Sequence, residues 1–230
     1  MVSFDWYIEV PHTENLTQGD IFFNFPVPII EYYDKYPFFR PKWTKKDVVL
    51  ITQACDIEQG KTTELTFCPI VPAEKAAADL MSLDVKNSRD NQWKNGGKKE
   101  EGPIILDFTK ESTLKKARNK INEIRKGELT SLHLLNETTV QTENMVMNSK
   151  VVLLKDTYQL PLKTVLSIAH DAEAYPHRLR LLPPYREHLA QAFASVYSRI
   201  GLPKVINHRE LRLNFPPTIE FPYEKPKMEE

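Results

Sequence analysis

Apolar residues gather in three short runs within the first third of the chain. Residues 20–25, 48–52 and 65–71 are rich in aromatic and β-branched side chains, and residues 48–52 form a continuous run. Turn-forming residues bound the first run, with Gly19 before it and Pro26 after it. Short apolar runs with such flanks are typical of β-strands, and a continuous run is typical of a strand covered on both faces. Three strands of a sheet are therefore predicted.

Later segments show the helical period instead. Leu114, Ala117, Ile121 and Ile124 are spaced three to four residues apart, and Gly127 follows where a C-cap glycine belongs. Other segments are assigned from similar periods and from proline and glycine boundaries. The predicted helices are residues 73–83, 111–126, 161–170 and 184–200, and two further strands are predicted at residues 131–135 and 150–155.

This pattern predicts an α+β protein with a small β-barrel-like core and a single domain over residues 1–230. Residues 84–102 have almost no apolar side chains and are expected to form a mobile loop. The predicted parts are a barrel core of residues 15–72 and 131–160, a helical insertion of residues 73–127, a C-terminal helix of residues 184–200 and an extended, proline-rich tail of residues 203–230.

Composition and charge narrow the classes of function. The 230 residues carry 31 lysines and arginines against 31 aspartates and glutamates, so any basic surface is local. Only 7 glycines occur, which disfavours a glycine-rich phosphate loop. No apolar stretch approaches the roughly 18 residues of a membrane span, so no membrane partner is expected. Two cysteines without a secretory signal pattern predict a cytoplasmic protein, and the scattered histidines predict neither a metal nor another cofactor.

Two short segments carry a family resemblance. Residues 18–21 (Gln-Gly-Asp-Ile) are followed by a proline-rich loop and then by residues 48–51 (Val-Val-Leu-Ile). This order resembles the opening of the MazF/PemK growth-inhibitor toxins. The resemblance implies an SH3-like barrel with the helix of residues 184–200 packed outside it. Residues 52–57 and 180–203 also resemble a widespread group of uncharacterised prokaryotic proteins, which implies a shared fold unit and no particular reaction.

The toxin resemblance also implies where a ribonuclease would keep its catalytic groups. That family uses an arginine in the loop after its first strand, a place that Arg40 matches, and a Ser or Thr just after its second strand. Here Cys55 and Asp56 stand near the hydroxyl position, with Thr52 just ahead of them. Because a carboxylate repels the phosphate of RNA, the residues favour binding over cleavage.

A cysteine-dependent hydrolase is a second catalytic hypothesis. Cys55 follows a predicted strand and needs a base or a cation to form its thiolate, a role that His133 would fill. Asp20 or Asp56 would orient the imidazole in a Cys-His-Asp arrangement. The alternative is that Cys55 is small, buried and inert, since an adjacent carboxylate disfavours a thiolate.

Aromatic side chains of the proline-rich segment predict a binding surface. Tyr32, Tyr33 and Phe38 belong to residues 26–46, which contain four prolines and are expected to form a loop. Such side chains stack on nucleic-acid bases or dock on a protein. The alternative is that the loop only covers an exposed edge of the barrel.

Basic side chains predict a second surface. Cations on one amphipathic helix and in the C-terminal part would together form a groove for a phosphate backbone, and the alternative is an ordinary solvated face. The predicted groove combines Lys115, Lys116, Arg118, Lys120, Arg125 and Lys126 with Arg178, Arg180, Arg186 and Arg199.

The function predicted from these features is a cytoplasmic, prokaryotic binding or regulatory component of a toxin- or phage-defence-related module, with weak catalysis or none. The partner is a protein or RNA. The alternatives are an endoribonuclease-like toxin and a cysteine-dependent hydrolase. One rim of the barrel, beside the aromatic loop, is expected to present Arg40, Gln53, Cys55 and Asp56.

Overall fold

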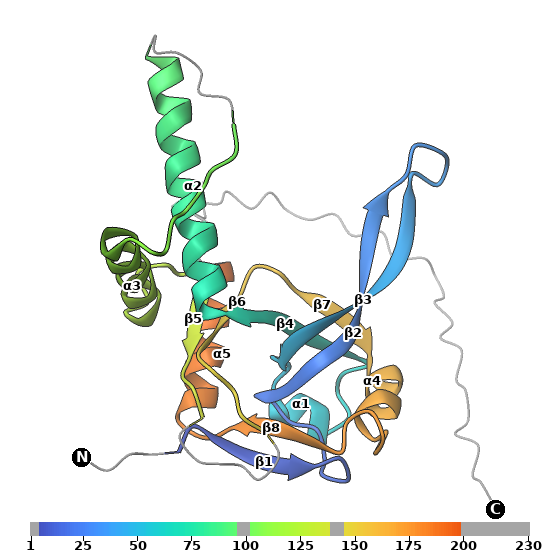
Figure 1. Cartoon of the computed structure of the whole chain (residues 1–230). Helices are drawn as coiled ribbons and strands as arrows, with labels where there is room; N and C mark the ends of the chain where they lie inside the picture. Colours follow the sequence, from blue (N-terminus) through green and yellow to red (C-terminus); the bar gives the residue numbers. More distant parts are fainter. Residues whose placement is uncertain (1–4, 96–101, 139–144, 199–230) are drawn as a thin grey trace, which may run out of the picture. The chain divides into compact units, whose positions relative to one another are not determined.

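A computed structural model describes residues 5–95, 102–138 and 145–198, which belong to one compact unit (Figure 1). The protein is α+β, as the sequence predicts. Its elements in chain order are β1 (Tyr7–Pro11), β2 (Asp20–Tyr32), β3 (Phe39–Leu50), α1 (Ala54–Glu58), β4 (Glu64–Pro72), α2 (Ala73–Lys94), α3 (Glu111–Arg125), β5 (Leu132–Leu135), β6 (Lys150–Leu153), β7 (Tyr158–Pro161), α4 (Leu162–Ala169), β8 (His177–Leu181) and α5 (Tyr185–Ser198).

The strands form an open antiparallel sheet in the order β1-β8-β2-β3-β4-β6-β5, and β7 pairs with β4 off this path. The three strands predicted from apolar runs are β2, β3 and β4, which lie next to one another. The predictions of β5 and β6 are also confirmed. β1 and β8 were missed because each has only 5 residues and includes charged side chains, which leaves little apolar pattern.

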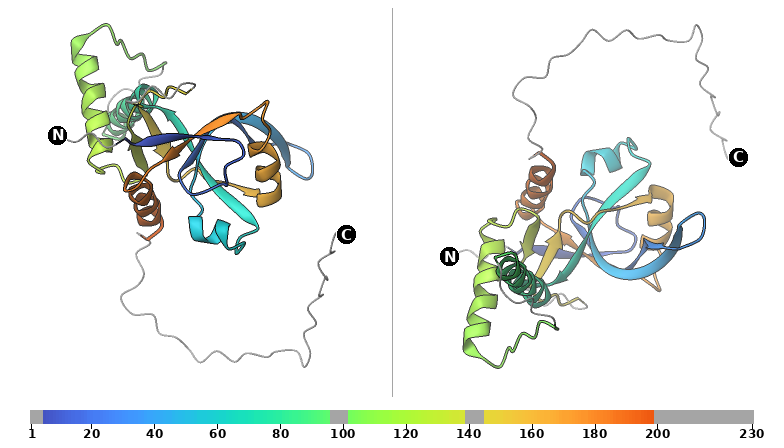
Figure 2. Two further views of the ribbon diagram at one scale, coloured as in Figure 1. Left: turned by 90° about the horizontal axis from the view of Figure 1, so that it is seen from below. Right: turned by 90° about the horizontal axis from the view of Figure 1, so that it is seen from above.

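Successive residues of β3 face opposite sides of the sheet, and a core forms on each side. Val48 and Leu50 pack in one core with Val165 of α4. Val49 packs in the other core with Leu189 of α5. The two helices therefore cover different faces of the sheet (Figure 2). A strand buried on both faces explains the continuous apolar run from which β3 was predicted.

The helical insertion forms as predicted, but its first helix is longer than expected. α2 continues through Lys94, so the predicted mobile loop is wrong for residues 84–94. Those residues contain neither glycine nor proline. Once the first turns are fixed by buried residues such as Ala76, the helix extends into solvent without needing an apolar stripe. Of the rest of that predicted loop, residues 96–101 lie outside the described residues.

The last described element, α5, confirms the predicted C-terminal helix up to Ser198. The predicted tail of residues 203–230, and with it the end of the predicted single domain, lies outside the described residues. Among the helices that the structure describes, none combines the length and the apolar character needed to cross a membrane.

A β-hairpin replaces the loop predicted over residues 26–46. β2 and β3 continue side by side to Tyr32 and Phe39 and extend beyond the sheet as an arm, here defined as residues 26–45 (Figure 1, blue). Prolines suggested a loop because they cannot donate to a strand ladder. Cross-strand pairs of an antiparallel ladder alternate between two classes, hydrogen-bonded and non-hydrogen-bonded. Pro26, Pro28 and Pro41 all belong to pairs of the same class. Pairs of one class exchange no hydrogen bonds, so prolines confined to that class leave the ladder intact.

Candidate functional site

One face of the arm is apolar and exposed to solvent. Residues directly opposite each other in an antiparallel pair place their side chains on the same face. Three consecutive pairs of this face are apolar on both strands, and their Ile30, Tyr32, Phe39 and Trp43 are between 49% and 83% exposed. We call this surface the arm face. It comprises the pairs Pro28–Trp43, Ile30–Pro41 and Tyr32–Phe39.

The opposite face of the arm carries Glu31, Arg40 and Lys42, whereas Lys45, paired with Pro26, is on the apolar side at the base of the arm. Lys42 Nζ lies 3.2 Å from Glu31 Oε1, and the Arg40 guanidinium lies 4.5 Å from the centre of the Tyr33 ring. At the tip, Phe38 packs edge-to-face against another aromatic ring at 6.1 Å. The predicted residues Tyr32, Tyr33, Phe38 and Arg40 are therefore all in or beside the arm, but Tyr32 is on the apolar face, while Arg40 and Tyr33 belong to the charged one.

The predicted rim forms in part beside α1. Thr52, Gln53 and Asp56 line one cavity of about 590 Å³, together with side chains of α5. The Thr52 hydroxyl oxygen accepts a hydrogen bond of 2.7 Å from the backbone N–H of Thr66. Cys55 is exposed, with its Sγ 3.7 Å from oxygens of both Gln53 and Asp56. Arg40 does not line this cavity, so the structure does not join it to Thr52.

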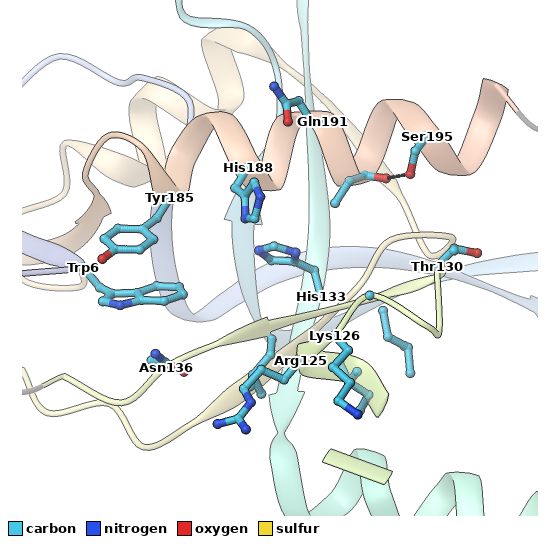
Figure 3. A pocket seen from close by; sticks show the side chains of 15 residues that line it. Trp6, Arg125, Lys126, Thr130, His133, Asn136, Tyr185, His188, Gln191 and Ser195 are labelled. Carbon is cyan, nitrogen blue, oxygen red and sulfur yellow. Dashed lines mark hydrogen bonds between the residues drawn. The ribbon is translucent and has the colours of Figure 1, made fainter. Parts of the chain in front are cut away.

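His133 lies on β5 and faces a different cavity of about 630 Å³, which we call the histidine cavity (Figure 3). Its ring stands edge-to-face to that of His188 on α5, with the ring centres 6.2 Å apart and the planes at 80°. Burial, and then the neighbouring His188, lower the pKa of His133 to about 4. The imidazole of His133 is therefore neutral at pH 7.

The predicted Cys-His-Asp arrangement is not formed. Neither Cys55 nor Asp56 lines the histidine cavity. Asp20 is fully buried, where its carboxylate accepts hydrogen bonds from Arg178 and Arg180. The prediction that Asp20 or Asp56 orients His133 is thus wrong. Asp20 is at the start of β2, beside β8, and Asp56 is on α1.

The predicted basic groove is also not assembled. Arg178 is only 1% exposed, and Arg180 shares the same carboxylate partner. Arg199 lies outside the described residues, and the remaining cations are on helix surfaces. Lys115 and Lys116 are exposed on α3, Arg118 of α3 pairs with Glu111 at 3.1 Å, and Arg186 of α5 pairs with Glu187 at 2.8 Å.

Several residues of the histidine cavity were missed by the sequence prediction. Trp6 stacks on Tyr185, with ring centres 3.8 Å apart and planes at 11° (Figure 3). Arg125 and Lys126, at the end of α3, line the same cavity; the sequence had assigned them to the basic groove and not to a site with His133. These residues come from the start, the middle and the end of the described chain, and no local pattern links them. Only a topology that places β1 beside β8 brings Trp6 to α5.

Within the described ranges, no three His, Cys, Asp or Glu side chains gather where a metal ion would be held. No family model, no curated protein and no solved structure matches the chain.

Proposed function

We propose that this chain is a binding component that docks on another protein through the arm face, as a regulatory part of a prokaryotic toxin- or phage-defence-related module. The observation that carries the proposal is the exposure of three consecutive apolar cross-strand pairs on one side of a projecting hairpin. Contiguous exposed apolar surface of this kind marks interaction sites in folded proteins.

The residue types of the arm face suit a protein interface. Trp43 and Tyr32 are of the types that contribute most when they become buried in a binding partner. Proline at positions 28 and 41 stiffens the two strands, so less conformational entropy is lost on binding. The partner we propose presents an uncharged, apolar groove or sheet edge.

The distribution of charge favours a protein partner over RNA. Single-stranded RNA requires cations beside the aromatic rings, to hold the phosphates while the bases stack. On the arm, Arg40 and Lys42 belong to the face opposite Tyr32 and Trp43, and Lys42 is paired with Glu31. An apolar face with Lys45 beyond its last pair, and with Arg40 and Lys42 turned away, is complementary to an apolar protein surface.

A relation to the SH3-like barrels of MazF/PemK toxins is part of the same proposal. The two segments that resemble the toxins contact each other in this chain. Gln18 Nε2 donates to the carbonyl oxygen of Ile51 at 2.8 Å, and Gly19 N donates to that of Leu50 at 2.9 Å. These contacts support the view that residues 18–21 and 48–51 form one strand entry of the toxin type. They concern ancestry and do not require ribonuclease activity.

The test is affinity capture from a lysate of the native host, with and without nuclease treatment. The full chain is compared with a double variant of the arm face, Tyr32→Ser with Trp43→Ser. The matched control is Glu31→Ala with Lys42→Ala, which removes a pair from the opposite face of the same arm. We expect a stoichiometric protein that survives nuclease and binds the control. Its capture by the arm-face variant should fall at least tenfold.

Two outcomes would overturn the proposal. One is a partner captured equally by the wild-type protein and the arm-face variant, provided that both have the same Tm. The other is RNA as the captured species, lost on nuclease treatment and weakened by Arg40→Ala. The latter result would support the endoribonuclease-like alternative instead.

A further inference from the structure

The histidine cavity has the size and the composition of a small-molecule site. Its volume of about 630 Å³ falls within the roughly 300–1,000 Å³ of ligand pockets. It lies between α5, β5 and the end of α3, where Figure 3 shows the imidazoles of His133 and His188 facing one another. The arm contributes no residue to it, so this site is separate from the arm face.

The charge of the cavity selects for anions. No aspartate or glutamate is among the residues that line it, whereas Arg125 and Lys126 both are. Within the described part of the chain, Arg125 makes no ion pair, and Lys126 is 3.8 Å from the exposed Glu128. Arg125 therefore remains available to a ligand, as does Lys126, whose pair with Glu128 is long and exposed to solvent. A lining that has two cations and no carboxylate favours a positive local potential.

The two imidazoles of the cavity, those of His133 and His188, are also without hydrogen-bond partners in the described part of the chain. A neutral imidazole offers one hydrogen-bond donor and one acceptor. It therefore suits a heterocyclic ring that presents both donors and acceptors along one edge. The stacked rings of Trp6 and Tyr185 form an aromatic wall beside them. The side chain of Gln191 adds an amide to the same lining.

We propose that the histidine cavity binds a phosphorylated heteroaromatic compound of the size of a nucleoside monophosphate. The ring lies against the imidazoles and Trp6, and the phosphate is held by Arg125 and Lys126. The shared chemistry occurs in a free nucleotide and in the 5′-phosphorylated end of an RNA strand.

The test is isothermal titration calorimetry of the full chain with AMP, GMP, CMP and UMP, and with adenosine and inorganic phosphate as partial probes. We expect saturable binding of at least one monophosphate with one site per chain, and at least tenfold weaker binding of adenosine and of phosphate. Arg125→Glu and His188→Ala should each weaken binding at least tenfold. Both side chains are exposed, so both variants should fold.

The matched control is Lys115→Glu, which makes the same charge change on the same helix away from the cavity. It should bind like the wild-type protein. A 5′-phosphorylated RNA hexamer identifies the source: tighter binding than the monophosphates indicates an RNA end, and weaker binding indicates a free nucleotide. The proposal is overturned if no monophosphate binds at millimolar concentration, if adenosine binds as tightly as AMP, or if Arg125→Glu and Lys115→Glu have equal effects.

Discussion

Arg178 and Asp20 form an ion pair closed off from water, with the arginine Nε 2.8 Å from the carboxylate Oδ2 and side chains only 2% and 0% exposed. The rest of the guanidinium donates to the backbone carbonyl oxygens of Pro11, Glu14 and Asn15. This network joins β8 to the start of β2 and to the turn between β1 and β2. It explains why two charged residues are buried in the core.

Replacing Asp20 with alanine should lower the free energy of unfolding by about 3–5 kcal/mol, because Arg178 would remain buried without its charge partner. Urea unfolding monitored by circular dichroism measures the loss. The control is Glu31→Gln, which breaks the exposed pair with Lys42 and should cost less than about 1 kcal/mol. Equal losses in the two variants would show that the buried pair has no special role in stability.

The histidine cavity predicts a dependence of stability on pH. The pKa of His133 is about 4 in the folded protein against 6.5 ordinarily, owing first to burial and then to His188. Arg125 and Lys126 line the same cavity. Between these two pH values the unfolded chain binds a proton at this residue that the folded protein does not. Stability is therefore greatest above pH 6.5 and falls as the pH drops towards 4.

The loss attributable to His133 between pH 7 and pH 5 should be about 2 kcal/mol, and His133→Gln should remove it. Chemical unfolding at several pH values measures the slope. The matched control is His170→Gln, at an exposed position after α4, which should retain the slope of the wild-type protein. A His133→Gln protein with an unchanged slope would contradict the account.

A residue in the left-handed backbone conformation lies at the base of the arm. Asn24 has φ +55° within the bulge between Phe22 and Phe25, and its backbone N–H donates to Asp47 Oδ1 at 3.0 Å. Asn24→Gly should leave the free energy of unfolding nearly unchanged, whereas Asn24→Val should cost about 1–2 kcal/mol because a β-branched residue resists positive φ. Thermal unfolding distinguishes them. Equal Tm values for the two variants would argue against strain at this position.

The elements that the sequence predicted correctly are those whose own side chains determine them. The apolar run of β3 and the stripe of α3 are local patterns that tertiary packing reinforces. The arm was missed because Pro28 and Pro41 are compatible with a strand only in certain registers. The register is fixed by the pairing of the two strands and cannot be read from either strand alone. The predicted helix was shorter than α2 because the last turns of α2 contain no buried residue. These turns therefore lack the apolar pattern from which a helix is predicted.

The candidate site was less predictable than the fold. Thr52, Gln53 and Asp56 were found together because they are close in sequence. The meeting of His133 with His188 depends instead on α5 crossing over β5, and no periodicity encodes that contact. The pairing of Asp20 with Arg178 is equally non-local, and it removes from the surface a cation that the sequence assigned to a groove.

The two cysteines should differ sharply in reactivity. Cys55 is exposed on α1, whereas Cys68 is fully buried in β4, where desolvation and then the charge of Asp156 raise the pKa of its thiol to about 12. Because the thiolate is the reactive species, iodoacetamide at pH 7.5 should add one label to the native protein, at Cys55, and two in urea. Peptide mass spectrometry locates the label. Cys55→Ser should take up none in the native state, and labelling of native Cys68 at the rate of Cys55 would show that this core opens far more readily than its packing implies.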